Sequence, residues 1–275
     1  QRQAIPPSAV LQDSTGSSDI LMDPAVRADL FEYLLRLGDD RLVLGHRLSE
    51  WCGHAPILEE DIALANMALD LIGQASNLLR LAGEIEGSGR DEDALAYFRE
   101  AIEFRNALIM ELPRGDFAFT IGRQFLVSLF EVLYLEQLAR SAHEHLAGIA
   151  SKAHKEARYH LRHSADWLLK LGDGTPESHQ RMQRALDELW PYTGELFETD
   201  EIERRLAESG VGVDSSTLRT RWLEEARRAI EAATLAVPND SFMHTGGRRG
   251  RHTEHLGHML AEMQIVARSF PGAKW

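Results

Sequence analysis

The chain has 275 residues, with 30 Lys or Arg against 43 Asp or Glu, so its formal net charge is −13. This balance argues against nucleic acid or an anionic membrane surface as a partner, because both would repel the chain. The single cysteine, Cys52, excludes an internal disulfide framework and cysteine-rich zinc modules. With 44% hydrophobic residues, the composition is typical of a globular protein, and we expect a cytoplasmic one.

The first residues precede any helical pattern and are rich in Pro, Gly and Ser. We therefore expect a flexible tail at 1–22 and a single domain over 23–275. The tail lacks the apolar run of a signal peptide. No stretch of the chain approaches the ~18 uninterrupted apolar residues of a membrane-spanning helix.

Apolar residues recur at three- and four-residue spacing from residue 24 onward, which predicts amphipathic helices. The period is clearest in 57–86, where one helix face collects Leu58, Ile62, Ala65, Leu69, Ile72 and Leu79. The other helices are expected at 24–50, 91–112, 117–142, 144–171, 177–197, 199–209, 215–236 and 252–269.

Pro191 should kink the helix at 177–197, because proline lacks a backbone donor. The sequence has no alternating strand pattern, no glycine-rich phosphate loop and no internal repeat. Several helices of about 25 residues favour a bundle. The predicted fold class is all-α, with a four-helix bundle core and additional C-terminal helices around it.

Long helices with acids and histidines raise the possibility of a ferritin-like di-iron site. Such sites take a Glu from two helices and a Glu-x-x-His pair from the other two, because positions i and i+3 share a face. Here neither pair is intact: Asp70 is followed by Gly73, and His160 is preceded by Ala157. Glu156 lies four residues before His160, so a rearranged metal site stays open as an alternative.

The favoured interpretation of these positions is structural. Asp70 and His160 are expected to be core polar groups that pair with each other, or with Arg80 or Arg158. A half-occupied ligand set has too few donors to hold two irons.

A second cluster lies near the C-terminus, where His252, His255 and His258 are spaced by three and Glu262 follows. These groups could hold one metal ion. Three-residue spacing drifts around a helix, however, so the histidines do not converge easily. A role in a polar network or towards a partner is favoured.

A basic loop containing Arg248, Arg249 and Arg251 precedes this cluster in an otherwise acidic chain. It leads into a helix N-terminus, where backbone N–H groups favour anions. A phosphate group or an acidic partner surface could bind there. A solvated turn held by surface carboxylates is equally expected.

Several ungapped blocks resemble the PaaC family, the structural subunits of bacterial phenylacetyl-CoA epoxidases. The blocks are 37–40, 50–56, 64–75, 155–162, 245–247 and 252–257, with 106–113 less sharply similar. The resemblance runs from about residue 30 to Trp275.

The resemblance implies a ferritin-like fold and a non-catalytic role beside a catalytic PaaA-type subunit. That partner uses O₂ and a di-iron centre to epoxidise the ring of phenylacetyl-CoA, with electrons from a reductase subunit that carries flavin and iron–sulfur groups. The resemblance therefore implies no cofactor in this chain and a part in aerobic phenylacetate catabolism. It makes CoA a candidate anion for the basic loop and a pseudo-symmetric heterodimer the expected assembly.

The resemblance also locates the lost ligands. The Glu-Ala-Gly-His of catalytic relatives matches residues 70–73, where the acid remains and the histidine is lost. Their Glu-Ser-Phe-His matches residues 157–160, where the acid is lost and the histidine remains. The first-helix position stays open between Asp40 and Arg41, and the third between Ser128 and Glu131.

We therefore carry over no catalytic and no metal-binding residue. The alternative hypothesis is a catalytic di-iron oxygenase subunit with a rearranged site built on Asp70, Glu156 and His160. An iron-storage protein is a further alternative, and it too requires an intact ligand set.

Overall fold

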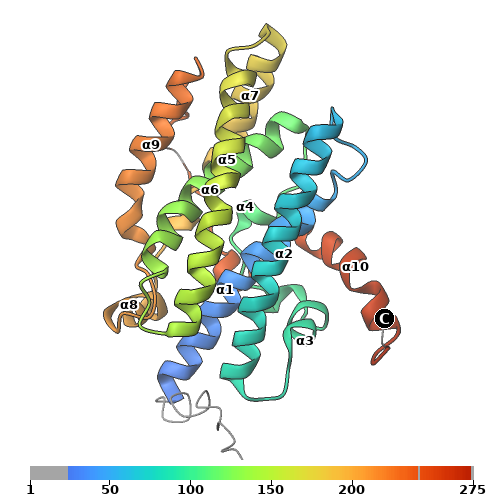
Figure 1. Ribbon diagram of the computed structural model, residues 1–275, viewed down its shortest axis with the longest axis vertical. Helices are drawn as coiled ribbons and strands as arrows, with labels where there is room; N and C mark the ends of the chain where they lie inside the picture. The colour runs from blue at the N-terminus through green and yellow to red at the C-terminus, as the bar shows by residue number, and fades with distance from the viewer. Residues whose placement is uncertain (1–23, 241, 274–275) are drawn as a thin grey trace, which may run out of the picture.

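The computed structural model describes residues 24–240 and 242–273, so the tail predicted at 1–22 lies outside the described residues. Within these ranges the chain forms α-helices and short 3₁₀ turns and no strand, which confirms the predicted all-α class (Figure 1).

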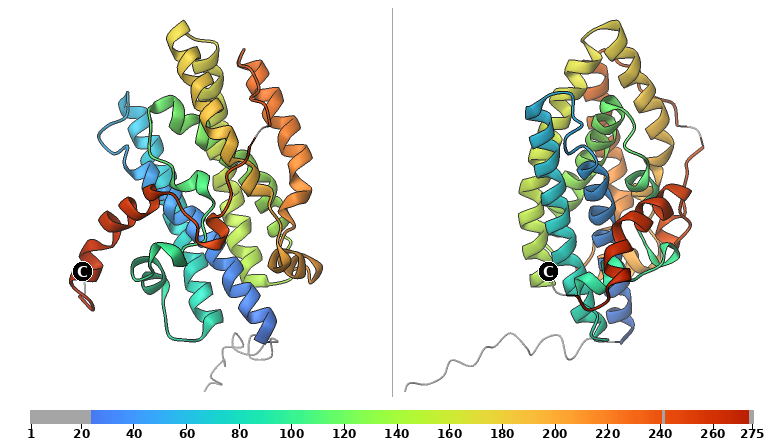
Figure 2. Two further views of the ribbon diagram at one scale, coloured as in Figure 1. Left: turned by 180° about the vertical axis from the view of Figure 1, so that it is seen from behind. Right: turned by 90° about the vertical axis from the view of Figure 1, so that its right-hand side faces the viewer.

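Four long helices form the core of the bundle. They are α1 (Pro24–Ser49), α2 (Leu58–Glu86), α5 (Phe117–Leu138) and α6 (Glu144–Gly172). Helix α1 packs along α2, and α5 packs along α6. The side view in Figure 2 shows α2 and α6 as one outer layer, with α1 and α5 behind them at the centre. This arrangement is the four-helix core that the sequence predicts.

The shorter helices cover the other side of the central pair. They are α3 (Glu92–Tyr97), α4 (Leu108–Glu111), α7 (Pro176–Leu189), α8 (Glu201–Glu208), α9 (Arg219–Ala232) and α10 (Glu254–Ser269). Helices α7 and α9 pack on α5 and α6, and α8 packs on α1. Helix α10 extends away from the bundle and packs against α3 (Figures 1 and 2).

The predicted helix at 91–112 is wrong. The segment consists of α3, a 3₁₀ turn η2 (Ala101–Glu103) and α4, separated by extended residues. Carboxylates of α1 take its backbone donors, since the Arg105 N–H donates to Asp39 at 2.8 Å and the Ala107 N–H to Asp40 at 2.8 Å. These long-range bonds replace the hydrogen bonds of a continuous helix.

Two helix boundaries also differ from the prediction. Helix α7 ends at Leu189, and Pro191 lies in a 3₁₀ turn, η3 (Trp190–Tyr192), followed by η4 (Gly194–Phe197). Proline thus ends the helix rather than kinking it. The helix predicted from 215 begins as the 3₁₀ turn η5 (Ser215–Leu218), and α9 ends at Ala232.

Helix α2 presents apolar residues on two faces. The residues facing the core are Leu64, Met67, Leu71 and Leu78, all buried. Of the apolar face predicted for this helix, Leu58, Ile62 and Leu69 are instead 72%, 54% and 67% exposed. We call these three residues the outer row. The predicted period is correct, but it describes mainly the face that the bundle does not cover.

Helices α2 and α5 have the length and composition of membrane spans. In α5, however, 89% of the apolar window is buried inside the protein, as in the core helix of a soluble bundle. In α2 the uncovered apolar residues include the outer row.

Two glycines of α2 give a matched stability test. A Cβ at position 83 would lie 2.0 Å from the Arg90 carbonyl oxygen, whereas a Cβ at position 73 meets nothing within 4 Å. We expect Gly83→Ala to lower the free energy of unfolding by about 1–3 kcal/mol through overpacking. Gly73→Ala should raise it by about 0.5–1 kcal/mol through helix propensity. Urea denaturation of both variants measures the difference, and equal effects would contradict the close approach of residues 83 and 90.

Candidate functional site

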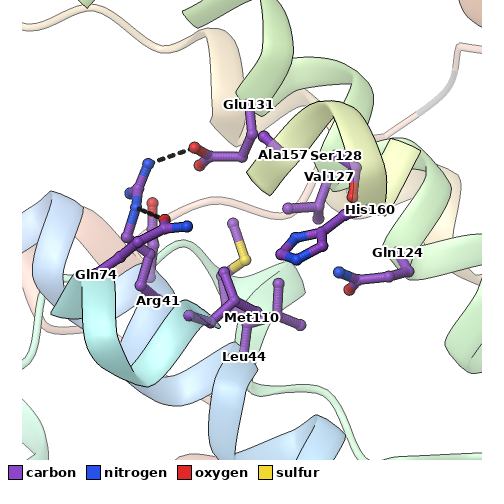
Figure 3. A pocket seen from close by; sticks show the side chains of 12 residues that line it. Arg41, Leu44, Gln74, Met110, Gln124, Val127, Ser128, Glu131, Ala157 and His160 are labelled. Atoms are coloured by element: carbon purple, nitrogen blue, oxygen red, sulfur yellow. Dashed lines mark hydrogen bonds and ion pairs between the residues drawn. The ribbon is translucent and has the colours of Figure 1, made fainter. Parts of the chain in front are cut away.

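The guanidinium group of Arg41 lies at the centre of the four-helix core (Figure 3). Its Nε donates to Gln74 Oε1 at 2.9 Å, and its Nη1 donates to the Leu37 carbonyl at 2.9 Å. Its Nη2 forms a buried ion pair with Glu131. One cation from α1 is therefore held by side chains of α2 and α5.

The contacts continue to the fourth helix, since Gln74 Nε2 donates to Glu156 Oε2 at 2.8 Å. Glu131, Arg41, Gln74 and Glu156 thus form one polar string, to which α5, α1, α2 and α6 each contribute one residue. The string fixes how the four helices lie relative to one another at mid-bundle.

The local sequence explains how Arg41 reaches the centre. Asp39, Asp40 and Arg41 are consecutive, buried, and about 100° apart around α1. Asp39 pairs with Arg99, and Asp40 binds both terminal nitrogens of Arg248, at 2.9 and 2.7 Å. Each of the two buried acids is therefore neutralised by an arginine from outside the four core helices, and Arg41 remains to pair with Glu131.

The charge of Glu131 depends on the charge of Arg41. Burial raises the pKa of Glu131, because the carboxylate loses hydration, and the charge of Arg41 acts in the opposite direction. A buried carboxylate without this cation would bear the full desolvation cost. The cation is thus the structural counter-ion of Glu131.

A small cavity adjoins the string. Its volume is about 10 Å³, the room of about one water molecule. It is lined by residues from the bundle core, namely Asp40, Arg41, Gln74, Gln124, Ser128, Glu131, Ala157 and His160, together with apolar neighbours. Gln124 Oε1 is buried and accepts no hydrogen bond. The open positions of the first and third helices therefore all lie here: Asp40 and Arg41, and Ser128 and Glu131.

The positions on α2 and α6 that match the Glu-x-x-His motifs of catalytic relatives are 70, 73, 157 and 160. Ala157 and His160 line the cavity, and His160 Nε2 lies 3.0 Å from Asp70 Oδ2 at its edge. The predicted pairing of Asp70 with His160 is therefore present. Gly73 is exposed, and Gln74 takes the inward position beside it.

Gln74 was missed by the sequence reasoning. The available signal was a polar side chain four residues after Asp70, on a helix whose neighbouring positions are apolar. A polar residue at such a spacing shares a face with the acid and belongs to the same site.

The donor set does not fit a pair of iron ions. Glu131 is neutralised by Arg41, Asp40 by Arg248, and His160 faces Asp70. Within 24–240 and 242–273, no three or more His, Cys, Asp or Glu residues are grouped so as to hold a metal ion. The position between the helices is instead taken by a guanidinium group, which repels cations.

The three C-terminal histidines do not converge. His252 precedes α10, with its Nδ1 2.7 Å from Glu111 Oε2 and its Nε2 3.0 Å from the Phe104 carbonyl. Both of those atoms are acceptors, so the two contacts together favour the doubly protonated, cationic ring. His255 is partly buried and His258 is exposed on α10. The cluster thus contributes one histidine to a polar network, the interpretation favoured from spacing.

The basic loop divides into an inward and an outward part. Arg248 turns into the protein and pairs with Asp40, while Arg249 and Arg251 are exposed. Burial would lower the pKa of Arg248, but the carboxylate of Asp40 outweighs it and the pKa rises. Arg248 therefore fastens the loop to α1. Arg249 and Arg251 remain the candidates for an anion or a partner.

Comparison with known proteins gives two matches. A family described as "Phenylacetic acid catabolic protein" matches residues 17–275. A relative from Escherichia coli (strain K12), one of the subunits of its 1,2-phenylacetyl-CoA epoxidase, is 52% identical over 246 residues, which cover 90% of this chain and 99% of the relative. These matches confirm the resemblance found in the sequence.

Because Arg41 is the only cation of the polar string, its removal should lower the free energy of unfolding substantially. Arg41→Met should lower the free energy of unfolding by about 3–5 kcal/mol, because Glu131 is left buried without a counter-ion. The double variant Arg41→Met, Glu131→Met should recover much of this loss. The exposed Arg158→Met on α6 is the control and should change stability by less than ~0.5 kcal/mol. A similar small effect at Arg41, measured by chemical denaturation, would show that the pair is not a structural constraint.

His252 predicts a defined pH dependence. Burial lowers its pKa, but the hydrogen bond and charge of Glu111 outweigh this, so the folded pKa lies above the ordinary 6.5. The stabilisation is therefore complete below pH 6.5 and is lost as pH rises through the folded pKa. The stability difference between the natural chain and His252→Gln should shrink over that window. A difference that is constant with pH would contradict a charged His252.

Proposed function

The chain belongs to the phenylacetic acid catabolic protein family, and on that premise we propose that it is the structural subunit of a phenylacetyl-CoA epoxidase complex. In this role it supports a separate di-iron catalytic subunit in aerobic phenylacetate degradation. The observation that carries the proposal is the Arg41 guanidinium, bonded to Gln74 and Glu131 where a catalytic bundle would need metal ligands.

The same contacts argue against catalysis by this chain. A reactive di-iron site needs carboxylates free to bind metal and a coordination position open to O₂. Glu156 accepts a hydrogen bond from Gln74, and Asp70 pairs with His160. The three residues that the alternative hypothesis needs as metal ligands therefore bind other side chains of the protein. An iron-storage role meets the same objection. We propose that this chain carries no cofactor of its own and acts in the cytoplasm.

The outer row offers the docking surface for the catalytic subunit. Leu58, Ile62 and Leu69 are exposed along one face of α2, and the half-exposed Tyr159 lies on neighbouring α6. Contiguous exposed apolar side chains mark protein interaction sites. Because the two subunits share one family, a pseudo-twofold pairing through equivalent faces would cover the outer row with matching apolar residues of the partner.

A row of cations on α6 adds a charge preference to the proposed contact with the partner. Lys155, Arg158 and Arg162 are exposed along α6 at helical spacing. Such a basic row in an acidic chain selects a partner whose contact is apolar at the centre and acidic at that edge. Arg249 and Arg251 keep a separate proposed role, in contact with a CoA phosphate or with another subunit.

Assembly tests the docking surface. The double variant Ile62→Asp, Leu69→Asp should weaken the complex with the co-expressed catalytic subunit by at least about 30-fold, because two buried carboxylates would cost ~2 kcal/mol or more at an interface centre. Co-purification and size-exclusion chromatography measure the loss. Ile265→Asp, on α10, is a matched exposed control that should assemble normally. Intact assembly of the double variant would place the interface elsewhere.

O₂ consumption tests the alternative hypothesis that this chain is itself catalytic. In complexes assembled with Asp70→Asn or His160→Gln, O₂ consumption with phenylacetyl-CoA per complex should stay unchanged. Loss of turnover in a fully assembled complex would assign the chemistry to this chain and overturn the structural role.

A further inference from the structure

Three aromatic rings lie together on the surface beside the basic loop. The Tyr192 and His244 rings are stacked, with their centroids 4.5 Å apart and their planes at 19°. The Phe242 ring stands perpendicular to His244, with centroids 5.0 Å apart. Phe242 is 72% exposed, so most of its ring is open to solvent. We call Tyr192, Phe242 and His244 the aromatic cluster.

The backbone around the aromatic cluster is fixed to the protein. The His244 N–H donates to the Pro191 carbonyl at 2.8 Å. Between the two rings, Met243 packs against Gly194 so closely that a Cβ at position 194 would lie 2.8 Å from its Cγ. The exposed Phe242 ring is therefore presented from an anchored segment, and ordering it for a ligand costs little entropy.

The basic loop is held equally tightly. Glu195 is buried and accepts a hydrogen bond from the Gly246 N–H at 2.8 Å. A Cβ at Gly247 would lie 2.2 Å from the Asn106 carbonyl oxygen, so the backbone of the loop lies directly on its neighbour. With Arg248 paired to Asp40 as well, the loop presents its two outer arginines from a fixed position.

Arg249 and Arg251 flank the residues that follow the aromatic cluster. Their backbone N–H groups both donate to the Gly246 carbonyl at 2.9 Å, so both residues lie close to this glycine. The Arg249 Nη2 donates to the Thr245 hydroxyl at 3.4 Å, and Thr245 directly follows His244. The Arg251 side chain lies against Gly246, where an added Cβ would be 3.0 Å from its own Cβ.

Both arginines have charge left for a ligand. Arg249 lies 4.0 Å from Glu198, and both side chains are largely exposed, so this ion pair contributes little. Arg251 is exposed, and among the residues that the structure describes no carboxylate pairs with it. Guanidinium groups bind phosphates through charge-assisted hydrogen bonds, and nucleobases stack on exposed aromatic rings. An open ring beside two such cations therefore fits a nucleotide.

We propose that Phe242, Arg249 and Arg251 bind the nucleotide end of the CoA thioester on which the epoxidase complex acts. The inference rests on the proposed function, which supplies CoA as the ligand. Adenine stacks on Phe242, and the arginines bind the phosphates. CoA carries phosphate at both the 3′ and the 5′ position of its ribose, so it offers a separate group to each arginine. The chain thus contributes to substrate affinity and takes no part in the chemistry.

Calorimetric titration of the full chain with adenosine 3′,5′-bisphosphate tests the proposal, because this probe carries the base and both phosphate positions of CoA. We expect saturable binding that weakens as NaCl is added. Arg251→Gln should weaken it by about 10-fold or more, and Phe242→Ala by about 5-fold or more. The exposed Arg227→Gln on α9 and Phe270→Ala after α10 are matched controls that should leave the affinity unchanged.

Two comparison probes define what the site recognises. ADP lacks the 3′-phosphate and should bind about 10-fold more weakly than the bisphosphate. Equal affinities would assign the site to free nucleotides and would overturn the assignment to CoA. Inorganic phosphate should bind weakly, and Phe242→Ala should not change its affinity, because phosphate has no base to stack.

The assembled complex gives a kinetic test of the same site. In a complex that contains Arg251→Gln, the KM for phenylacetyl-CoA should rise by about 10-fold while kcat stays unchanged. This pattern is expected for a contact that is equally strong in the ground state and in the transition state. A fall in kcat at unchanged KM would contradict a role in nucleotide binding.

The proposal is overturned if the bisphosphate shows no saturable binding to either the chain or the complex. It is also overturned if Arg251→Gln and Phe242→Ala bind the bisphosphate as tightly as the two controls. Loss of a subunit from the Arg249→Gln or Arg251→Gln complex, at unaltered bisphosphate affinity, would assign the loop to a protein partner instead. A complex that still assembles and consumes O₂ in these cases leaves the structural role standing, so the two failures are distinguishable.

Discussion

A buried guanidinium group sets the conditions for the rest of this bundle. Taking a cation out of water costs several kcal/mol unless its donors and charge are satisfied. Arg41 meets this requirement with Glu131 from α5, Gln74 from α2 and a carbonyl of its own helix, and Gln74 extends the contact to α6. These contacts connect all four core helices around a cavity with room for about one water molecule.

The same stretch of α1 organises the outer parts of the molecule. Asp39 binds Arg99 and orders the segment after α3, and Asp40 binds Arg248 and fastens the loop before α10. One short run of charged residues thus connects the core, the α3 region and the C-terminal helix. The polar side chains inside the bundle bind one another and hold the helices together. The outer row on α2 and the cations of α6 are exposed. That division suits a protein whose task is to hold a partner.

Much of this could be predicted from the sequence, and the failures have physical causes. The helical period and the two broken Glu-x-x-His motifs were accessible, because they depend on spacing within helices. The Asp70–His160 pair joins two helices, and it could be anticipated because a buried acid and a buried histidine each need a polar partner. The segment 91–112 was misjudged because side chains of α1 capture its backbone donors, an interaction over more than sixty residues. The sequence placed the outer row on one apolar face of its helix but did not say what that face meets, because periodicity does not tell a core from a docking surface. Arg248 was assigned to the surface because its charge, not its partner Asp40, is visible in a sequence.

The iron content of the isolated chain tests the central claim most directly. The chain would be incubated with Fe(II) without oxygen, freed of unbound metal and analysed by elemental analysis and Mössbauer spectroscopy. The account predicts no bound iron above background, because the guanidinium of Arg41 and its partners leave neither the charge nor the donors for it. A stoichiometric pair of irons with a di-iron spectrum would contradict it.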